Sequence, residues 1–335
     1  MIIISDCLTN CADEGTIKIA SKIAKLMKDH HAAIFQLNDF CSFSDQTFRV
    51  GRFGVSKDLL KRVAKEEGNI LYIPNASMTK AVCIKILILR LLTRKKIFLL
   101  PVYRRQVTGQ MALLLRMAGV ELIVLSKESN DIYKSCLPNR VHYVRAGVDT
   151  KQFSPVSEDQ AIQLRSKYGY DTEKTIVLHV GHMVEARNIR KLMELDKNFQ
   201  IILLVSTSTR WDEKLYQDLS KCENIKIIHE YIPHIEEYYQ MADVYYFPVE
   251  QIGCVDVPLS VLEAASCGTP IVSTEYGELK SFEESKGFLF IKDFADSNKL
   301  IEDAKKERQN LNREKIKEYD WHVAVDKIFK ICGGK

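Results

Sequence analysis

Residues 258–273, PLSVLEAASCGTPIVS, combine the start of a helix with a carboxylate just inside it. Pro258 suits the first turn of a helix, and Leu259 and Leu262 share one apolar face, with Glu263 on a neighbouring face. Gly268 is expected to end this helix before the β-branched run IVST. The positive end of a helix attracts phosphate, and a nearby carboxylate can accept hydrogen bonds from a sugar's hydroxyl pair. The segment therefore predicts a site for a nucleotide diphosphate and its ribose.

The string also resembles the donor-site signature of retaining glycosyltransferases with the two-domain GT-B fold, in particular glycosyltransferase family 4. Three more segments are similar to the same family and occur in the same order: AGVDTKQFSP (146–155), VLHVGHMVEARNIRKL (177–192) and HEYIPHIEEYYQMADVYYFP (229–248). The first resembles the start of the family's second domain, the next its diphosphate-binding strand, loop and helix, and the last its base-binding region. The resemblance covers most of residues 146–290.

The resemblance implies which residues face the departing diphosphate, where cationic groups stabilise developing charge. The family places a Gly-Arg pair after the first strand of the second domain and a lysine shortly after it. The matching residues here are Gly181, His182 and Arg187. Arg187 keeps a permanent charge and can bind phosphate with two hydrogen bonds, whereas His182 is mostly neutral at neutral pH unless the diphosphate raises its pKa. Arg187 could instead be a solvated arginine at a helix start.

The same resemblance makes Glu263 the second glutamate of the family's Glu-x7-Glu motif, which binds the ribose hydroxyls. An ordinary surface glutamate is the alternative. Val255 stands where the first glutamate is expected, and the neighbouring Asp256 either takes over contacts to sugar or phosphate or is a plain loop aspartate. The backbone N–H groups of Leu259 and Ser260, in the first helical turn, are expected to bind phosphate directly. The resemblance thus implies a catalytic set of Arg187, His182, Asp256 and Glu263.

A short turn, Tyr231, Ile232 and Pro233, follows a predicted strand and by resemblance lines the nucleotide base with main-chain groups. The adjacent His234 is more simply a surface histidine than a ligand. The resemblance thus completes a donor site made of these three residues with Gly15, Gly181, His182, Arg187, Asp256, Leu259, Ser260 and Glu263.

The family binds its acceptor on the N-terminal domain, where the resemblance is thinner. Gly15 precedes a predicted helix at the place of the family's glycine-rich turn near the phosphate. The segment YIPNASMTK, with Asn75, resembles a second acceptor-side loop, and IFLLPVYRR supplies Tyr103 and Arg104 after a later strand. Many family members carry a histidine there, but the sequence has none between His31 and His142. Another group must serve instead, or the activity is atypical.

Apolar, β-rich runs alternate with helical stretches along the whole chain, which predicts an α/β protein with two doubly wound, Rossmann-like domains. We assign 1–150 to an N-terminal domain on the acceptor side and 151–317 to a C-terminal domain on the nucleotide-sugar donor side. By resemblance, the helix expected at about 318–335 crosses back to the first domain, and the two domains face each other across a cleft. Expected strands are 2–5, 33–37, 70–73, 97–102, 121–125 and 141–144, then 175–180, 201–206, 225–229, 244–248 and 271–274. Helices are expected over 16–28, 56–67 and 312–332, among others.

Charge is distributed unevenly between the two halves. Residues 1–150 hold 23 Lys/Arg and 13 Asp/Glu, a formal charge of about +10. The remaining residues hold 25 Lys/Arg and 31 Asp/Glu, a formal charge of about −6, so the net charge of the chain is +4. A basic half suggests an anionic partner, such as a membrane surface or a lipid-linked phosphate. Nucleic acid is disfavoured because the sequence lacks basic runs interleaved with aromatic residues.

The segment AVCIKILILRLLTRKK (81–96) has two interpretations. Apolar residues surround most of it, which is typical of a buried core helix and is the interpretation we favour for its body. Its series of basic residues, continued by Arg104 and Arg105, could instead face anionic lipid, which would make the protein peripheral at the inner face of a membrane.

The nine cysteines include no CxxC pair, which suggests mostly buried thiols in a reducing compartment rather than disulfides. No signal peptide or membrane-spanning stretch is recognisable, so we expect a cytoplasmic protein.

The sequence contains no G-x-G-x-x-G after a strand, no P-loop and no Asp-x-Asp pair. We therefore expect chemistry without cofactor or metal. The resemblance implies transfer of a sugar from a nucleotide diphosphate sugar to the hydroxyl of a sugar or lipid-linked acceptor, with retention, in surface polysaccharide or glycolipid synthesis. The departures at Val255 and His182 leave open a non-catalytic GT-B module that binds a partner glycosyltransferase or a glycan. A GT-B epimerase acting on a nucleotide sugar is a further alternative.

Overall fold

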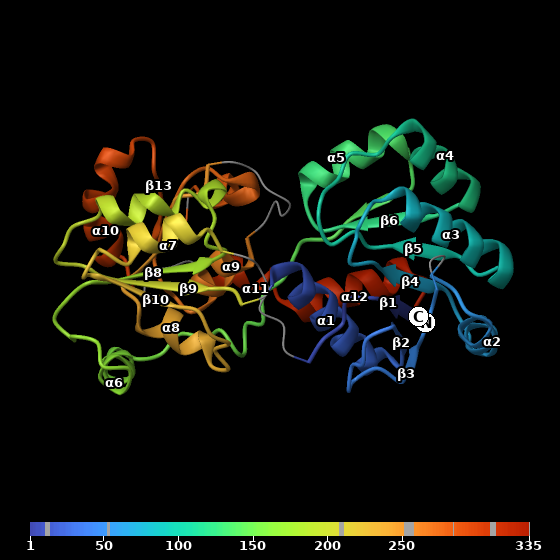
Figure 1. Ribbon diagram of the computed structural model, residues 1–335, viewed down its shortest axis with the longest axis horizontal. Helices are drawn as coiled ribbons and strands as arrows, with labels where there is room; N and C mark the ends of the chain where they lie inside the picture. Colours follow the sequence, from blue (N-terminus) through green and yellow to red (C-terminus); the bar gives the residue numbers. More distant parts are fainter. Residues whose placement is uncertain are drawn as a thin grey trace. The chain divides into compact units, whose positions relative to one another are not determined.

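The computed structural model describes residues 1–10, 14–51, 54–207, 211–250, 258–283, 285–308 and 313–334. The chain divides into two compact units. The first contains Met1–Ala146 and the chain from Trp321 onward, and the second contains the described residues of 147–320. Each unit has its own sheet, hydrophobic core and helices, as expected for independently packed domains (Figure 1).

In the described part of the first unit, seven parallel strands form one sheet in the order β3-β2-β1-β4-β5-β6-β7. They are β1 Ile2–Ser5, β2 Ala33–Leu37, β3 Gln46–Phe48, β4 Ile70–Ile73, β5 Ile97–Leu99, β6 Glu121–Val124 and β7 Val141–Tyr143. The order reverses between β1 and β4. In open α/β sheets ligands bind beyond the carboxyl ends of the strands at such a switch point.

Helices cover both faces of this sheet, and many begin at a residue whose side chain caps them. Ser56, Thr79, Thr108 and Ser126 each accept a hydrogen bond from the backbone N–H three residues later. The helices are α1 Gly15–Met27, α2 Lys57–Lys65, α3 Lys80–Thr93, α4 Gly109–Ala118, α5 Lys127–Cys136 and α12 Trp321–Ile331, with a 3₁₀ turn η1 at Lys28–His30. Figure 1 shows α12 (red) beside α1 (blue), and α3 beside α4.

In the described part of the second unit, six parallel strands form a sheet in the order β10-β9-β8-β11-β12-β13, with the switch point between β8 and β11. They are β8 Ile176–Gly181, β9 Gln200–Val205, β10 Ile225–Ile228, β11 Val244–Phe247, β12 Ile271–Ser273 and β13 Phe288–Phe290.

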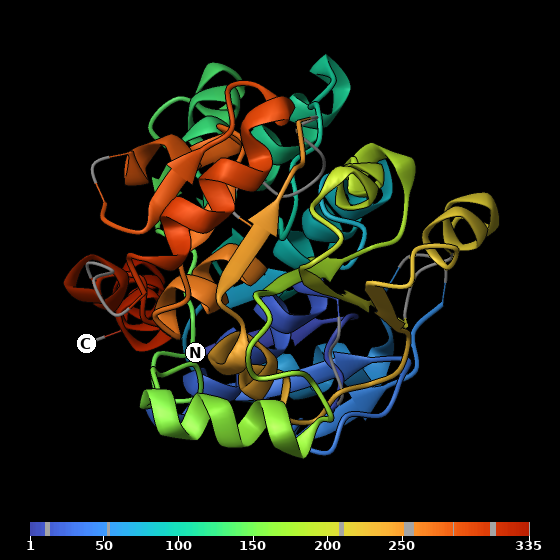
Figure 2. The same ribbon diagram turned by 90° about the vertical axis from the view of Figure 1, so that its left-hand side faces the viewer.

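The α-helices of this unit are α6 Glu158–Lys167, α7 Glu213–Leu219, α8 Ile235–Met241, α9 Leu259–Ser266, α10 Ser297–Lys305 and α11 Arg313–Lys317. The 3₁₀ segments are η2 Glu185–Arg187, η3 Ile189–Glu194, η4 Gly277–Phe282 and η5 Phe294–Asp296. Figure 2 shows α10 (orange-red) on one side of the sheet and α6 (bright green) on the other.

Several predicted elements differ in the structure. The strands Gln46–Phe48 and Phe288–Phe290 were not expected, since both are three-residue edge strands that carry little hydrophobic pattern. The helix expected after β8 is replaced by two 3₁₀ segments, because Asn188, at φ 53°, interrupts a helical path. The C-terminal stretch is two helices rather than one, and Asp320 between them forms a parallel bridge with Val148.

The body of the segment 81–96 is buried on one face only, contrary to the core-helix expectation. Val82, Cys83, Ile86 and Leu89 lie in the core, while Leu91 and Leu92 are 67% and 61% exposed. Within the described residues, no helix is long and apolar enough to cross a membrane.

Candidate functional site

The switch point of the second sheet brings the loop after β8 against the loop after β11. Gly181 is the last residue of β8 and pairs with Val205, and His182 follows it directly. The side-chain amide of Asn188 donates hydrogen bonds to the Pro248 carbonyl and to Glu250 Oε2, both at 3.2 Å. This link holds the predicted diphosphate loop against the strand that leads toward α9.

A buried histidine lies beneath this loop. His179 is fully buried on β8, and its Nδ1 donates a 2.8 Å hydrogen bond to the Tyr246 carbonyl. Burial lowers the pKa of His179 to about 4, the hydrogen bond to the Tyr246 carbonyl acts in the opposite direction, and the positive charge of Arg187 lowers it further. Arg187 is the last residue of η2, the 3₁₀ segment that follows β8.

Tyr245 of β11 connects the predicted donor-site residues. Its hydroxyl donates a 3.2 Å hydrogen bond to the Val180 carbonyl. Burial raises the pKa of Tyr245, a hydrogen bond with Ser260 and the one to Val180 lower it, and the opposite charges of Glu263 and Arg187 act on it in opposite directions. Two predicted donor residues therefore belong to one buried network: Ser260 bonds to Tyr245, and Glu263 bonds to Tyr239, whose ring centre lies 5.7 Å from that of Tyr245.

Glu263 is 5% exposed and is not a surface residue. Its Oε2 accepts a 2.8 Å hydrogen bond from the hydroxyl of Tyr239, which is fully buried on α8. Burial raises the pKa of Tyr239, and the negative charge of Glu263 acts in the same direction. The helix face that carries Glu263 thus faces α8, and the carboxylate has a built hydrogen-bond partner.

Helix α9 begins after Pro258, as the sequence predicts. The first helical hydrogen bond is donated by Val261 to the Pro258 carbonyl at 3.1 Å, so the N–H groups of Leu259 and Ser260 precede it. Their position at the start of α9 is the one expected for phosphate binding. Val255 and Asp256 lie outside the described residues, and the role of Asp256 stays a prediction.

The predicted base-binding turn lies further along the same sheet. Tyr231, Ile232 and Pro233 connect β10 to α8, and Tyr231 is 48% exposed. Strand β9 separates β10 from β8. His234 is exposed, and its Nδ1 lies 3.3 Å from Glu236 Oε1. The base-binding role of the turn stays a prediction.

In the first unit, the two predicted acceptor loops meet at the carboxyl ends of β4 and β5. The backbone N–H of Tyr103 donates a 3.2 Å hydrogen bond to Ser77 Oγ. The backbone N–H of Asn75 donates a 2.7 Å hydrogen bond to Asp6 Oδ1. Arg104 forms an ion pair with Glu128, so its charge is partly compensated.

Gly15 is the first residue of α1. A Cβ built on it meets no atom within 4 Å among the described residues, so packing there does not require glycine. A ligand approaching the backbone would be a separate reason for glycine, and its role near the phosphate stays a prediction.

Sequence reasoning missed His179, Tyr239 and Tyr245 in the second unit and Asp6 in the first. It placed Lys85 only in the basic series that could face lipid, whereas Lys85 is 14% exposed and pairs with Asp6. Two signals were available: His179 is a lone histidine in an apolar strand, and Asp6 directly follows the strand Ile2–Ser5. Within the described residues, no group of three or more His, Cys, Asp or Glu side chains is arranged to hold a metal ion.

Residues 174–305, which include β8 to β13, match the family profile described as glycosyl transferases group 1. The described residues of this match all lie in the second unit. None of the curated proteins matches the sequence significantly.

Solved glycosyltransferases share the fold over the whole chain. A glycosyltransferase from Rickettsia africae superposes with a TM-score of 0.76 at 12% identity, covering 99% of this chain and 97% of that one. The Anabaena protein Alr3699/HepE, in complex with UDP and glucose, gives 0.75 at 14% identity, covering 99% of each chain. WaaG, a glycosyltransferase involved in lipopolysaccharide biosynthesis, gives 0.64 at 13% identity and full coverage of both. The fold is therefore the GT-B fold of two Rossmann-like domains.

Proposed function

We propose that the protein is a glycosyltransferase that moves a sugar from a nucleotide diphosphate sugar to an acceptor hydroxyl with retention, without a metal ion. The observation that carries the proposal is the buried network at the switch point of the second sheet, in which Tyr239 bonds to Glu263 and packs against Tyr245, whose hydroxyl bonds to Val180 before the predicted diphosphate loop. The carboxylate of Glu263 and the N-terminal turn of α9 support a nucleotide site, because a nucleotide is expected to bind at this part of such a fold.

The chemistry follows from what transfer demands. Cleavage of the bond between the sugar and the diphosphate leaves negative charge on the diphosphate, which the guanidinium of Arg187 and the N–H groups of Leu259 and Ser260 would stabilise. Glu263 would accept hydrogen bonds from the ribose, with Tyr239 orienting its carboxylate. Retention rests on the family resemblance, in which the acceptor attacks from the face that the diphosphate leaves.

UDP-glucose is the first donor to test. The Anabaena protein that shares the fold was solved with UDP, with UDP and glucose, and with UDP-glucose. A role in surface polysaccharide or glycolipid synthesis is supported by WaaG, which shares the fold and is involved in lipopolysaccharide biosynthesis. Such acceptors are lipid-linked, so a cytoplasmic enzyme would have to work at a membrane surface.

A surface on the first unit fits that requirement. Leu91 and Leu92 of α3 and Leu113 and Met117 of α4 are between 58% and 67% exposed, and the two helices lie side by side (Figure 1). We name this group the α3–α4 surface. Residues 68–120 contain nine Lys/Arg and no Asp/Glu. Exposed apolar side chains within a wholly basic segment favour one partner, a bilayer rich in anionic lipid.

Thermal unfolding with UDP, GDP, ADP, dTDP and their glucose conjugates tests the proposal. A ligand at 100 times its dissociation constant stabilises the folded state by about 2.7 kcal/mol. We expect one nucleotide to raise the melting temperature of the wild type and of Arg190→Met, and to act weakly on Arg187→Met and Glu263→Gln. Arg190 is a matched control because it lies three residues on and already pairs with Glu185 and Asp218. If no nucleotide stabilises the protein, the proposal is wrong.

A non-catalytic module is the second candidate. The histidine at 182 and the valine at 255, where the family has an arginine and a glutamate, favour it. Release of the free nucleotide from the stabilising sugar donor, with and without a panel of acceptors, separates the two candidates. Donor binding without turnover under any condition would favour the module.

A further inference from the structure

An ion pair lies at the switch point of the first sheet. Asp6 directly follows β1, and Lys85 is on α3, the helix after β4. Lys85 Nζ lies 3.4 Å from Asp6 Oδ2, and the two side chains are 14% and 24% exposed. Because β1 and β4 are the strands between which the order reverses, the pair occupies the position where such folds bind ligands.

The polar groups of this pair are only partly hydrogen-bonded. Asp6 Oδ1 accepts a 2.7 Å bond from the Asn75 backbone, which fixes the carboxylate. Among the described residues, the long contact to Asp6 is the only hydrogen bond of the Lys85 ammonium group, which has three donors. A mostly buried ion pair costs desolvation energy that incomplete hydrogen bonding does not offset. The pair therefore retains capacity for a polar ligand.

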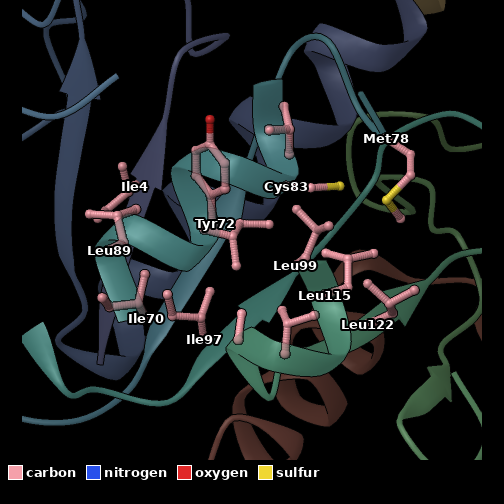
Figure 3. Packing of buried hydrophobic residues seen from close by; sticks show 14 of the residues in the cluster. Ile4, Ile70, Tyr72, Met78, Cys83, Leu89, Ile97, Leu99, Leu115 and Leu122 are labelled. Atoms are coloured by element: carbon pink, nitrogen blue, oxygen red, sulfur yellow. The ribbon is translucent and has the colours of Figure 1, made fainter. Parts of the chain in front are cut away.

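A buried hydroxyl lies beneath the pair. Tyr72 is fully buried, and its hydroxyl has no hydrogen-bond partner among the described residues. The Lys85 ammonium lies 5.2 Å from the centre of the Tyr72 ring. Burial and the charge of Asp6 raise the pKa of Tyr72. Figure 3 shows this hydroxyl pointing away from the aliphatic side chains around the ring, Ile70 and Ile97 among them. An unpaired buried hydroxyl is costly, and a shift of Lys85 or Asp6 on ligand binding would supply its partner.

The backbone leaves room for Lys85 at one point. Gly54 has φ +65°, and a Cβ built on it would lie 1.8 Å from Lys85 Cε. Gly54 therefore lies close against the lysine stem, whose ammonium group pairs with Asp6.

We propose that Asp6 and Lys85 bind the acceptor through its hydroxyl groups and that the acceptor end they hold is an uncharged sugar. This rests on the proposed function and extends it to the first unit. A carboxylate accepts and an ammonium donates hydrogen bonds, which matches the mixed donor and acceptor character of neighbouring sugar hydroxyls. The opposite charges of the pair cancel at 3.4 Å, so the site has no excess cation to select a phosphate. Tyr72 is a positioning residue, since its buried hydroxyl acts through the pair.

The test uses the full chain saturated with the nucleotide that stabilises it. The probes are p-nitrophenyl glucoside, galactoside and mannoside, with p-nitrophenyl phosphate as the anionic probe on the same aglycone. We expect at least one glycoside to bind, and Asp6→Asn and Lys85→Met to weaken it about tenfold or more, because hydrogen bonds to charged groups are lost. Nucleotide affinity should stay unchanged, since neither Asp6 nor Lys85 is among the residues predicted to bind the donor.

Glu121→Gln is the matched control. It removes the same charge from a carboxylate that pairs with Lys96 and contacts His142 at the opposite, amino-terminal edge of the same sheet. The proposal is wrong if no glycoside binds the wild type, if only the phosphate probe binds, or if Asp6→Asn binds like Glu121→Gln. Failure of all nucleotides to bind is a separate result and contradicts the proposed function instead.

Tyr72→Phe separates positioning from structure. Because the lost hydroxyl has no partner among the described residues, this variant should be as stable as the wild type or more stable. Tyr170→Phe is the control, since it removes the other buried tyrosine hydroxyl without a partner among the described residues. We expect Tyr72→Phe, and not Tyr170→Phe, to weaken glycoside binding about threefold, because a hydrogen bond formed only in the complex is lost. Equal glycoside affinity in the two variants would overturn the positioning role.

Discussion

The hydroxyl of Tyr239 donates a 2.8 Å hydrogen bond to Oε2 of Glu263, and both side chains are buried. The bond joins α8 to α9 across 24 residues of sequence. Glu263 is therefore oriented by a contact inside the second unit. By resemblance its carboxylate binds the ribose, and its position depends on Tyr239, which no sequence motif indicated.

Tyr239→Phe should destabilise the protein by about 1–3 kcal/mol, because the buried carboxylate of Glu263 loses a donor. Urea unfolding measures this change. Tyr246→Phe is the control, since Tyr246 is also buried but bonds to the neutral hydroxyl of Ser297 at 3.0 Å. It should cost about 1 kcal/mol. If Tyr239→Phe lowers the free energy of unfolding less than Tyr246→Phe does, the buried carboxylate of Glu263 does not need the hydrogen bond from Tyr239.

His179 should make the stability depend on pH. Its folded-state pKa of about 4 lies below its ordinary value of 6.5, so between these values the unfolded chain binds a proton that the folded chain does not. The contribution to stability is complete above pH 6.5 and is lost as the pH falls toward 4, by up to about 1.4 kcal/mol per pH unit.

Urea unfolding at several pH values from 4 to 6.5 tests this slope. His179→Phe should reduce it, whereas His234→Gln, which alters an exposed histidine, should keep it. The same slope in all three proteins would show that other groups control the acid sensitivity.

A buried ion pair should be the most sensitive electrostatic feature of the second unit. Arg165 Nη2 lies 2.7 Å from Asp243 Oδ1, with exposures of 8% and 5% for the two side chains. Asp243 also accepts a 2.8 Å hydrogen bond from the Ile176 backbone and forms an ion pair with Arg308 at 3.2 Å. Asp243→Ala leaves buried guanidinium groups without their partner and should cost about 3–5 kcal/mol.

Asp218→Ala is the matched control for that variant. Asp218 also contacts two cations, Arg190 and Lys221, but in an exposed network. Such surface pairs contribute about 0–1 kcal/mol. Chemical unfolding of both variants should therefore separate them by at least about 2 kcal/mol. Comparable decreases in the free energy of unfolding would indicate that the buried Arg165–Asp243 pair contributes no more to stability than the Asp218 network does.

The α3–α4 surface should bind anionic vesicles. We expect the wild type to float with vesicles rich in phosphatidylglycerol, to bind phosphatidylcholine vesicles weakly, and to dissociate at high salt. The double variant Leu91→Gln/Leu92→Gln should lose about tenfold or more in binding, since inserting a leucine side chain contributes about 1.5–3 kcal/mol.

The control for this experiment is Ile162→Gln. Ile162 is 41% exposed on the second unit, outside the α3–α4 surface. It should float like the wild type. Vesicle binding that is unchanged in the leucine variant, or insensitive to lipid charge, would exclude this surface as the membrane contact.

The sequence by itself determined the features that depend on near neighbours in the chain. Apolar runs such as Ile2–Ser5 and Ile70–Ile73 are strands as predicted, because their residues are buried on both faces of a parallel sheet. The start of α9 after Pro258 is also local, since helix initiation depends on a few consecutive residues.

The tertiary structure decided which of these elements are neighbours. Strand order brings Asp6 to Lys85, 79 residues away in sequence, and packing of α8 on α9 joins Tyr239 to Glu263. It also exposed Leu91 and Leu92, which the sequence pattern of an apolar helix had placed in the core. A local pattern records whether a residue is apolar or caps a helix. Which buried faces meet depends on how all the elements pack together, and that set the hydrogen-bond partners of the carboxylates at both candidate sites.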